Sequence, residues 1–448
     1  MRIETRKVLD KSFSALGVIS IGLMIAFLVL ILGPIVWKGS QAFIFSGTIE
    51  HRKLMFDHWD RGDKTQLNAE LDVVEKVRKP VFEIFEAYEL EVKGMPRKER
   101  GKRKKELKAL KKLVEELVGP FPGERQPVLF RQRYGQTRWD RVQVKLDKIL
   151  LKESWDYSDP DKGGIKVFKP RSEGFERTRM AELFSYIESN VEQMMRPKWT
   201  FYYQFITDSS LDSHIFGGIW PEFLGTLYLS IGAMIFAVPM GIFAAIYFCE
   251  YAKQGVVISF LRICISTLAG VPSIVFGLFG LAFFINTIQV SDSKSVLAGS
   301  LTLSLLVLPT IIRASEEAIQ AVPSSYKEAA LALGAGRWWT IVTIILPAAL
   351  PGILTGIVIC LGRAAGETAP IIFTAAVSVG KALKLDEVFT QPTPALPWNI
   401  YNLCTEHEAV DEIRHVQFGM VLALIMLVLV LNVGAIIIRA KVSKNLKV

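Results

Sequence analysis

Apolar residues in this chain are gathered into long blocks separated by polar stretches. A helix needs about 20 predominantly apolar residues to cross a bilayer, and six blocks have that character. The fourth is short and the fifth is long, so we expect tilts or breaks there. The pattern predicts an all-α polytopic membrane protein with six transmembrane helices at Val18–Trp37, Thr226–Phe248, Val257–Asn286, Val296–Ile312, Ile344–Ala376 and Phe418–Ile438.

A long polar region, residues 38–221, separates the first two blocks. It contains both stretches with apolar residues at helical spacing and stretches in which apolar and polar residues alternate. We therefore expect a small α+β domain. Its helices are predicted at Gln66–Val92, Arg97–Val118 and Arg177–Met195, and its strands at Gln126–Tyr134, Arg141–Leu151 and Gly164–Phe168.

Basic residues flank the first and last apolar blocks, so the positive-inside rule predicts that both termini lie in the cytoplasm. Six membrane crossings agree with that parity and place the long polar region outside. The first block is too long for a signal peptide and no cleavage pattern follows Trp37, so we interpret it as an anchor. The flanking residues are Arg2, Arg6, Lys7 and Lys11 at one end, and Arg439, Lys441, Lys444 and Lys447 at the other.

The chain has 448 residues, half of them hydrophobic, and a formal net charge of +9. The basic excess comes from the two tails and from the run Arg97–Lys112, and no nucleic-acid motif accompanies it. That run is interpreted as a solvated helix face, or as a contact with anionic lipid headgroups or a partner subunit. We expect the lipid bilayer as a partner and no nucleic acid.

Residues that would carry catalysis do not form a recognisable pattern. The four cysteines and five histidines lack metal-ligand spacing, so no metal or cofactor is expected. The chain also lacks the G-x-x-x-x-G-K-[ST] loop that binds nucleotide phosphates. We therefore predict a non-catalytic membrane subunit that does not bind ATP itself.

The connection between the fourth and fifth blocks has an unusual pattern of its own. Helix formers fill Ser324–Leu333 after Pro323, and the two serines at its start predict an N-terminal cap. Glycine at position 334 then allows the helix to end. Trp338 and Trp339 suit the water–headgroup interface. The fixed positions of the pattern are Glu328, Ala329, Ala330, Gly334, Ile344, Leu346 and Pro347.

This stretch resembles the EAA loop of ABC importer permeases, E-A-A-x3-G-x9-I-x-L-P, with every signature position filled. The resemblance implies that residues 314–347 form a cytoplasmic coupling loop that fits a groove on a separate ATPase subunit. The contacts with the ATPase would then come from Glu328, Ala329, Ala330, Gly334, Leu346 and Pro347. An alanine-rich surface helix between two spans is the alternative interpretation.

Three polar or helix-breaking features lie within the predicted spans. Pro272 removes a backbone donor from the third span, which predicts a break that either lines a cavity or only shapes packing. Arg363 and Glu367 share one face of the fifth span, where a charge costs at least ~2.5–3.5 kcal/mol at the centre. They form either a structural ion pair or part of a transport path. Arg313 ends the fourth span and either reaches the membrane surface or joins that path.

From Gly217 onward, the chain resembles the A-type permease subunit of the bacterial high-affinity phosphate ABC importer, and the first span resembles it loosely. The stretches that carry the resemblance are GVPSIVFGLFG at 270–280, GRAAGETAP at 362–370 and TPALPWNIY at 393–401. The first outer loop of typical members is short, so residues 42–198 are interpreted as an inserted domain. The predicted organisation is a tail and first span at 1–41, the insertion at 42–198, and the permease core at 199–448.

The resemblance implies the type I ABC importer permease fold in the bacterial cytoplasmic membrane. It also implies a heterodimer with a C-type permease, two cytoplasmic ATPase subunits and an extracytoplasmic phosphate-binding protein. Phosphate would pass residues that can receive an oxyanion. Two alternatives stay open: a permease for another oxyanion such as sulfate or molybdate, and a membrane sensor or scaffold in phosphate signalling. The predicted substrate path comprises Arg363, Glu367, Arg313, Thr368 and Ser273.

Overall fold

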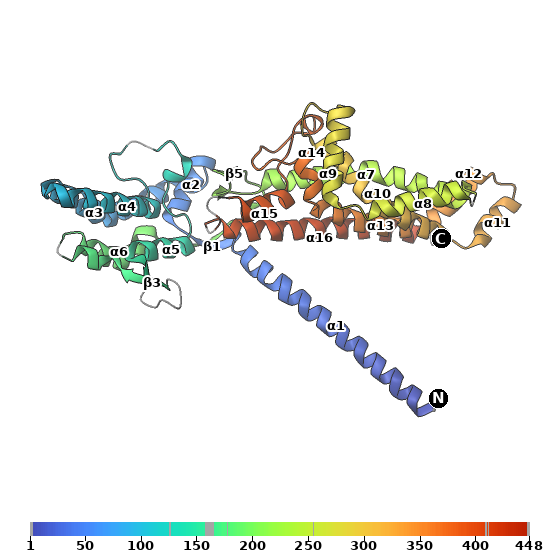
Figure 1. Ribbon diagram of the computed structural model, residues 1–448, viewed down its shortest axis with the longest axis horizontal. Helices are drawn as coiled ribbons and strands as arrows, with labels where there is room; N and C mark the ends of the chain where they lie inside the picture. The colour runs from blue at the N-terminus through green and yellow to red at the C-terminus, as the bar shows by residue number, and fades with distance from the viewer. Residues whose placement is uncertain are drawn as a thin grey trace. The chain divides into compact units, whose positions relative to one another are not determined.

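The computed structural model describes residues 3–124, 127–156, 165–176, 178–253, 255–407, 410 and 412–445. The chain divides into two compact units (Figure 1). One unit consists of residues 1–42 together with 203–448, and we call it the permease unit. The other consists of Phe43–Tyr202, and we call it the inserted unit.

Five helices of the permease unit are long and apolar enough to cross a membrane, and a bent pair makes a sixth candidate. The prediction of a multi-pass helical membrane protein is therefore confirmed. The five are α1 (Ile3–Ser40), α7 (Trp220–Ile246) with the π-helical turn η4 (Tyr247–Tyr251), α10 (Val296–Gln320), α12 (Arg337–Thr340) with η6 (Ile341–Ile345) and α13 (Leu346–Gly366), and α16 (Arg414–Asn445).

The predicted third span is not one straight helix. It consists of α8 (Val256–Ala269) and of α9 (Ser273–Gly280), which continues into the π-helical segment η5 (Leu281–Thr287). The two parts meet at an angle of 102°. Pro272 lies directly before α9 with an extended backbone, as expected for a residue that cannot continue the preceding helix.

The predicted fifth span, Ile344–Ala376, is broken, as its length led us to expect. The helix begins earlier, at Arg337, and α13 ends at Gly366. Glu367 has an extended backbone, and the chain forms a short helix again only at α14 (Ala369–Thr374). Pro370 in the first turn of α14 lacks the backbone donor that a continuous helix would need there.

Small residues set the packing of the permease unit. Helices α7, α10, α13 and α16 lie side by side (Figure 1). A Cβ added to Gly241 of α7 would approach Ile311 of α10 to 2.5 Å, and one added to Gly356 of α13 would approach Ala314 to 2.4 Å. Only glycine fits at such close helix crossings. Further short elements of this unit are η3 (Tyr203–Phe205), β5 (Ser210–Leu211), β6 (Phe216–Gly217), η7 (Glu387–Phe389) and α15 (Leu396–Thr405).

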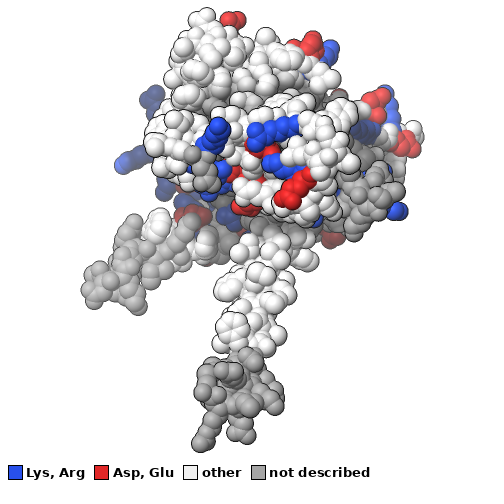
Figure 2. Space-filling model, turned by 90° about the vertical axis from the view of Figure 1, so that its right-hand side faces the viewer, with Lys and Arg blue, Asp and Glu red and all other residues white. Residues whose placement is uncertain are grey.

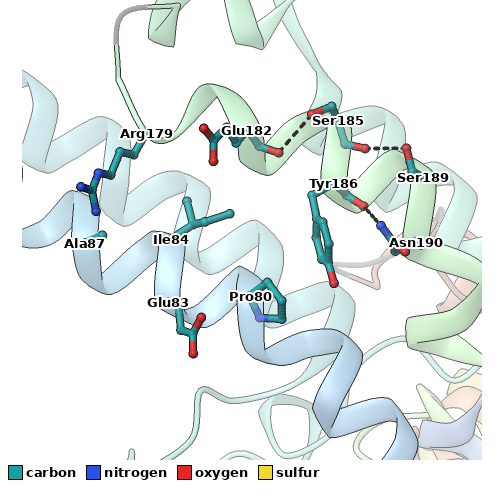
Figure 3. Close-up of a pocket in the computed structure, with 10 residues that line it drawn as sticks. All are labelled: Pro80, Glu83, Ile84, Ala87, Arg179, Glu182, Ser185, Tyr186, Ser189 and Asn190. Atoms are coloured by element: carbon teal, nitrogen blue, oxygen red, sulfur yellow. Dashed lines mark hydrogen bonds between the residues drawn. The ribbon is translucent and has the colours of Figure 1, made fainter.

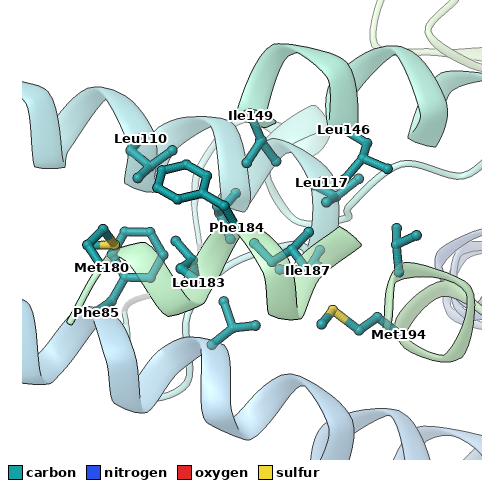
Figure 4. Packing of buried hydrophobic residues seen from close by; sticks show 14 of the residues in the cluster. Phe85, Leu110, Leu117, Leu146, Ile149, Met180, Leu183, Phe184, Ile187 and Met194 are labelled. Atoms are coloured by element: carbon teal, nitrogen blue, oxygen red, sulfur yellow. The ribbon is translucent and has the colours of Figure 1, made fainter. Parts of the chain in front are cut away.

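The inserted unit is mainly helical, and its core lies between the helices α3 (Lys64–Gly94), α4 (Arg97–Val118), α5 (Trp139–Leu150) and α6 (Ala181–Met195) (Figure 4). Phe85, Leu110, Ile149 and Ile187 are among the buried residues that meet there. Two antiparallel strand pairs complete it, and one of them joins the first and last strands of the unit. The elements are β1 (Ile44–Gly47), α2 (Ile49–Trp59), α3 (Lys64–Gly94), α4 (Arg97–Val118), η1 (Phe130–Gln132), α5 (Trp139–Leu150), β2 (Leu151–Asp156), β3 (Ile165–Pro170), η2 (Arg171–Phe175), α6 (Ala181–Met195) and β4 (Lys198–Phe201).

Two of the three predicted strands are wrong. The stretch 141–151 lies almost entirely in the helix α5, whose buried residues Val142, Leu146 and Ile149 follow helical spacing. The stretch 126–134 forms turns and the short helix η1, although Gln126 itself lies outside the described residues. The third prediction corresponds to β3, and its first residue, Gly164, is not described. Helix α6 begins at Ala181, and Arg177, predicted as its start, also lies outside the described residues.

A buried arginine connects several helices of the inserted unit. Arg78 of α3 donates to Glu50 Oε1 of α2 at 2.7 Å, to the carbonyl of Val118 at 2.7 Å and to that of Met194 at 2.9 Å. Arg78 and Glu50 are both buried. The guanidinium thus satisfies a buried carboxylate and carbonyls at the ends of two helices, which fixes their positions relative to α3.

Candidate functional site

The loop with the EAA pattern forms a short exposed helix, α11 (Ser324–Ala332), between α10 and α12. Glu328 and Ala329 are exposed, whereas Ala330 is buried against the rest of the unit. The serine cap predicted for the start of this helix is wrong. Pro323 occupies the N-cap position, without a side-chain hydrogen bond. Proline supplies a favourable backbone angle there but no acceptor.

Gly334 ends α11 in a Schellman motif. Its amide donates to the carbonyl of Leu331 at 3.0 Å, and the amide of Ala335 donates to that of Ala330 at 3.1 Å. The φ angle of Gly334 is +83°, a conformation that side-chain-bearing residues rarely adopt. No atom of the described residues lies within 4 Å of a Cβ built at this position, so backbone conformation, not space, requires the glycine.

Two contacts hold the loop against the end of α7. Lys327 Nζ of α11 lies 2.5 Å from Glu250 Oε2 in the η4 turn. The guanidinium of Arg337 lies over the ring of Tyr251, 5.2 Å from its centroid. Figure 2 looks onto this end of the molecule, where basic and acidic side chains gather over the middle of the face. Neither partner was predicted from the sequence, although a glutamate just after an apolar block was a usable signal.

The structure does not place all six predicted ATPase contacts on one surface. Glu328, Ala329 and Gly334 are exposed around α11. Leu346 and Pro347 instead lie half-buried in the first turn of α13, where Leu346 packs beside the core cluster that contains Ile345 and Ala349. Their positions fit a role in shaping the helix that follows the loop, since proline is favourable in a first helical turn.

The predicted ion pair of the substrate path is present. Arg363 Nε donates to Glu367 Oε1 at 3.3 Å, with side-chain exposures of 45% and 20%. Both residues lie at the end of α13, where the backbone leaves the helix. The guanidinium therefore has only part of its donor set occupied by Glu367 and keeps an accessible face.

Ser273 and Thr368 lie at the same end of a packed helix pair. Helix α9 packs closely along α14. A Cβ added to Gly277 would lie 3.0 Å from the carbonyl of Ala369, and one added to Gly280 would lie 2.9 Å from Thr374. Ser273 is the first residue of α9, and Thr368 is the N-cap of α14. Thr368 also follows Glu367 directly, so the break after α13 brings these polar groups to one region.

Arg313 belongs to a different contact. Its guanidinium is exposed and hydrogen-bonds the hydroxyl of Ser266 on α8. One turn further along α10, Glu316 Oε2 pairs with Arg262 Nη1 of α8 at 3.2 Å. The structure thus joins Arg313 to α8 and gives it no described contact with the Arg363 region.

The inserted unit has an open groove of about 810 Å³ between α3 and α6 (Figure 3). Two carboxylates and one arginine lie among its lining residues, together with hydroxyl and amide groups. This mixture does not favour an anion such as phosphate, because the two carboxylates outnumber the one arginine and repel an anion. The lining residues are Pro80, Glu83, Ile84, Ala87, Arg179, Glu182, Ser185, Tyr186, Ser189 and Asn190.

A buried polar cluster lies at the start of α7 and was missed in the sequence analysis. Glu222 Oε1 accepts from His214 Nε2 at 2.8 Å and from Asn399 Nδ2 of α15 at 3.1 Å. The three residues are 0%, 3% and 1% exposed, respectively. A glutamate two residues after Trp220, at the start of an apolar block, was the only signal in the sequence.

The comparisons with known proteins agree on one class. Residues 237–448 match the family described as binding-protein-dependent transport system inner membrane component. The probable ABC transporter permease protein YqgI of Bacillus subtilis is 34% identical over 59% of this chain and 90% of its own length. The phosphate transport system permease protein PstA 1 of Mycobacterium tuberculosis is 38% identical over 50% of this chain and 71% of its own length.

A solved structure gives a weaker likeness. The MetNI methionine ABC transporter in an inward-facing conformation aligns with 50% of this chain and 94% of its own chain, at 17% identity and a TM-score of 0.38.

Proposed function

Because this chain belongs to the PstA-type family of binding-protein-dependent ABC transporter permeases, we propose that it moves inorganic phosphate across the cytoplasmic membrane as the permease subunit of an ATP-driven importer. Members of this class work with ATPase subunits and a substrate-binding protein. The permease itself holds the path, and the partner ATPase hydrolyses ATP.

The observation that carries the proposal is the exposed helix α11 between two spanning helices. It displays Glu328 and Ala329 outward and is closed by the Schellman motif at Gly334. A short helix with a fixed end transmits a push as a rigid body. Such a helix on the cytoplasmic side is what an ATPase needs in order to act on a membrane bundle.

We propose that movement of α11 reaches the bundle by two connections. One is the ion pair between Lys327 and Glu250, which joins α11 to the end of α7. The other is the continuous helix that starts at Arg337 and ends beside Arg363. Displacement of α11 would therefore act on α7 and α13 together and alternate access to the path.

The proposed path for phosphate uses the polar groups at the break after α13. Arg363 supplies a planar set of donors that matches an oxyanion, and Glu367 orients it by the 3.3 Å contact. Thr368 and Ser273 add hydroxyl donors at the same end of the α9–α14 pair. Arg313, held by Ser266 on α8, is proposed as a second cationic position nearer the coupling loop.

The proposed assembly is a heterodimer with a C-type permease. All 14 residues of α8 are described and none is buried, although the helix is strongly apolar. Lipid or a neighbouring permease must cover such a surface. Helix α8 is bent relative to α9 and carries Arg262, which pairs with Glu316, and a bent helix with such a charged contact favours a protein neighbour over lipid. In this proposal both termini lie in the cytoplasm and the inserted unit lies outside.

The test is phosphate uptake into proteoliposomes that contain this chain with its partner permease, ATPase and binding protein. Gly334→Val forces a branched side chain into a positive φ angle and should abolish ATP-dependent uptake while the complex still assembles. Gly336→Ala is the matched control, because Gly336 has a φ of −70° and open space around it. That variant should transport normally.

The outcomes separate the possible functions. Uptake that needs ATP and is lost only in Gly334→Val supports the coupled permease. Uptake of sulfate or molybdate, with no uptake of phosphate itself, would assign another oxyanion. An assembled complex that hydrolyses ATP but accumulates no oxyanion would contradict the transport proposal and favour a sensor.

A further inference from the structure

The strand pair of β1 and β4 has one exposed face that is apolar. Successive side chains of a strand point to opposite faces, and directly paired residues share a face. Ile44 is paired with Phe201, and Ser46 is paired with Trp199. Ile44, Phe201 and Trp199 are 45%, 54% and 72% exposed, respectively. One face of the pair therefore presents three large apolar side chains together and carries no charge.

The opposite face of the strand pair is packed against the inserted unit. The ring of Phe45 meets that of His51 at 5.2 Å between centroids, and the guanidinium of Arg138 lies over the Phe45 ring at 4.1 Å. Lys198, the one charged residue of the two strands, pairs with Glu70. The polar and charged groups are thus satisfied on one side, and the exposed apolar side chains are confined to the other.

The strand pair also begins close, along the chain, to the end of a helix that can span a membrane. The apolar helix α1 ends at Ser40, and β1 begins at Ile44. Four residues of chain reach at most about 14 Å, and the paired strand β4 lies about 5 Å further away. The covalent chain therefore keeps Ile44 and Phe201 within reach of the membrane surface at which α1 ends.

We propose that Ile44, Trp199 and Phe201 form a membrane-interface contact, in which the three side chains enter the boundary between lipid headgroups and acyl chains. Tryptophan is enriched at this boundary, because its ring is apolar and its N–H can still meet water or a headgroup. The contact holds the strands through which the chain enters and leaves the inserted unit at the bilayer. It does not depend on the substrate that the permease moves.

The size of the exposed face favours lipid over a protein partner. A fully buried large side chain covers about 150–250 Å², and these three residues are each only about half to three-quarters exposed. Their sum stays well below the ~800 Å² per partner that a stable protein interface buries. A lipid surface needs no such minimum, because the spanning helices already hold the chain in the membrane.

The test is photo-cross-linking of the full-length chain in nanodiscs of phosphatidylcholine. Benzoylphenylalanine replaces Trp199 in one sample and Trp155 in the matched control, since Trp155 lies on β2 of the same unit and is 58% exposed. Mass spectrometry after illumination should find at least about tenfold more lipid adduct at position 199, because only a side chain at the interface reaches the acyl chains. Equal yields at both positions, or none at 199, would overturn the proposal.

The composition of the bilayer and the identity of the adduct give two further outcomes. Adding anionic phosphatidylglycerol should leave the lipid adduct at position 199 unchanged, because the exposed face has no charge. An adduct that forms only with the anionic lipid would overturn the proposal and assign the contact to basic residues elsewhere. A polypeptide adduct in place of lipid would also overturn it and identify this face as a protein docking surface.

A second measurement uses natural side chains and so does not depend on the introduced group. Brominated phosphatidylcholine quenches the fluorescence of tryptophan that lies in the bilayer. The quenched fraction should fall in Trp199→Phe relative to the wild type, whereas Trp155→Phe should not lower it. An unchanged quenched fraction in Trp199→Phe would place Trp199 in water and contradict the proposal.

Discussion

Lys327 Nζ of α11 lies 2.5 Å from Glu250 Oε2 in the η4 turn that follows α7. The side chain of Glu250 is 8% exposed and that of Lys327 is 34% exposed. An ion pair with one buried partner is screened less by salt than a surface pair. The contact is therefore suited to carry force between the loop and the membrane bundle.

Breaking this ion pair should uncouple the transporter. We expect Lys327→Met to reduce phosphate uptake roughly five- to thirty-fold, equivalent to about 1–2 kcal/mol of coupling, while the ATPase subunits continue to hydrolyse ATP. The measurement is the ratio of phosphate moved to ATP hydrolysed in proteoliposomes. Lys253→Met, at an exposed lysine beyond η4, is the control. An unchanged ratio in Lys327→Met would remove the ion pair from the mechanism.

Two substitutions of Arg363 should show whether phosphate uptake depends on the positive charge of its side chain or also on the planar shape of its guanidinium. Arg363→Lys keeps the charge but loses the planar fork, and we expect about a tenfold loss of uptake. Arg363→Gln should lose at least a hundredfold. Concentration dependence of uptake, measured alongside complex assembly, distinguishes a path residue from a structural one. Normal uptake by Arg363→Gln in an assembled complex would show that phosphate crosses elsewhere.

Acid should destabilise the inserted unit through His51. Burial, with the charges of Arg138 and Arg52 added, lowers the pKa of His51 from 6.5 to about 3. The unfolded unit therefore binds one more proton than the folded unit between those values. Stability is full above pH 6.5 and falls as the pH drops towards 3, by up to roughly 5 kcal/mol.

The measurement for His51 is the proteolysis rate of the inserted unit in the full-length chain, from pH 7 to pH 4. His51→Gln removes the titrating ring and should flatten the pH dependence. His58→Gln, at an exposed position of the same helix, should leave it as in the wild type. Equal pH dependence in all three proteins would assign the acid sensitivity to carboxylates.

Removal of Arg78 should destabilise the inserted unit more than removal of the whole ion pair. Arg78→Met leaves the Glu50 carboxylate buried without its cation, which costs about 3–5 kcal/mol. The double variant Arg78→Met with Glu50→Gln should recover part of that loss. Denaturant dependence of proteolysis within the inserted unit measures both, and equal losses in the single and double variants would contradict a charge-based explanation.

The helical core of both units could be predicted because its signals are local. The predicted helix Arg97–Val118 has the same bounds as α4, since apolar residues recur at helical spacing from Leu107 to Val118 and Pro96 precedes the helix. The break at Pro272 was predicted for the same reason, because proline acts on its own backbone. The strand predicted at 141–151 failed, since a short amphipathic helix and a strand share many apolar positions.

The polar contacts of the site could not be predicted in the same way. Lys327 and Glu250 are 77 residues apart, and Glu222 and Asn399 are 177 residues apart. Nothing in the spacing of such residues specifies a partner. Arg363 and Glu367 were predicted correctly as a pair because four residues along a helix bring two side chains to one face.

The antiparallel pairing of β1 with β4 places Ile44 opposite Phe201 and Gly47 opposite Lys198. The chain therefore enters and leaves the inserted unit through neighbouring strands, whose backbones lie about 5 Å apart. A tight turn could span that gap. The inserted unit could thus be deleted as a whole and replaced by a short turn. The same junction could accept an unrelated domain, such as a fluorescent reporter, without changing the length of any membrane helix.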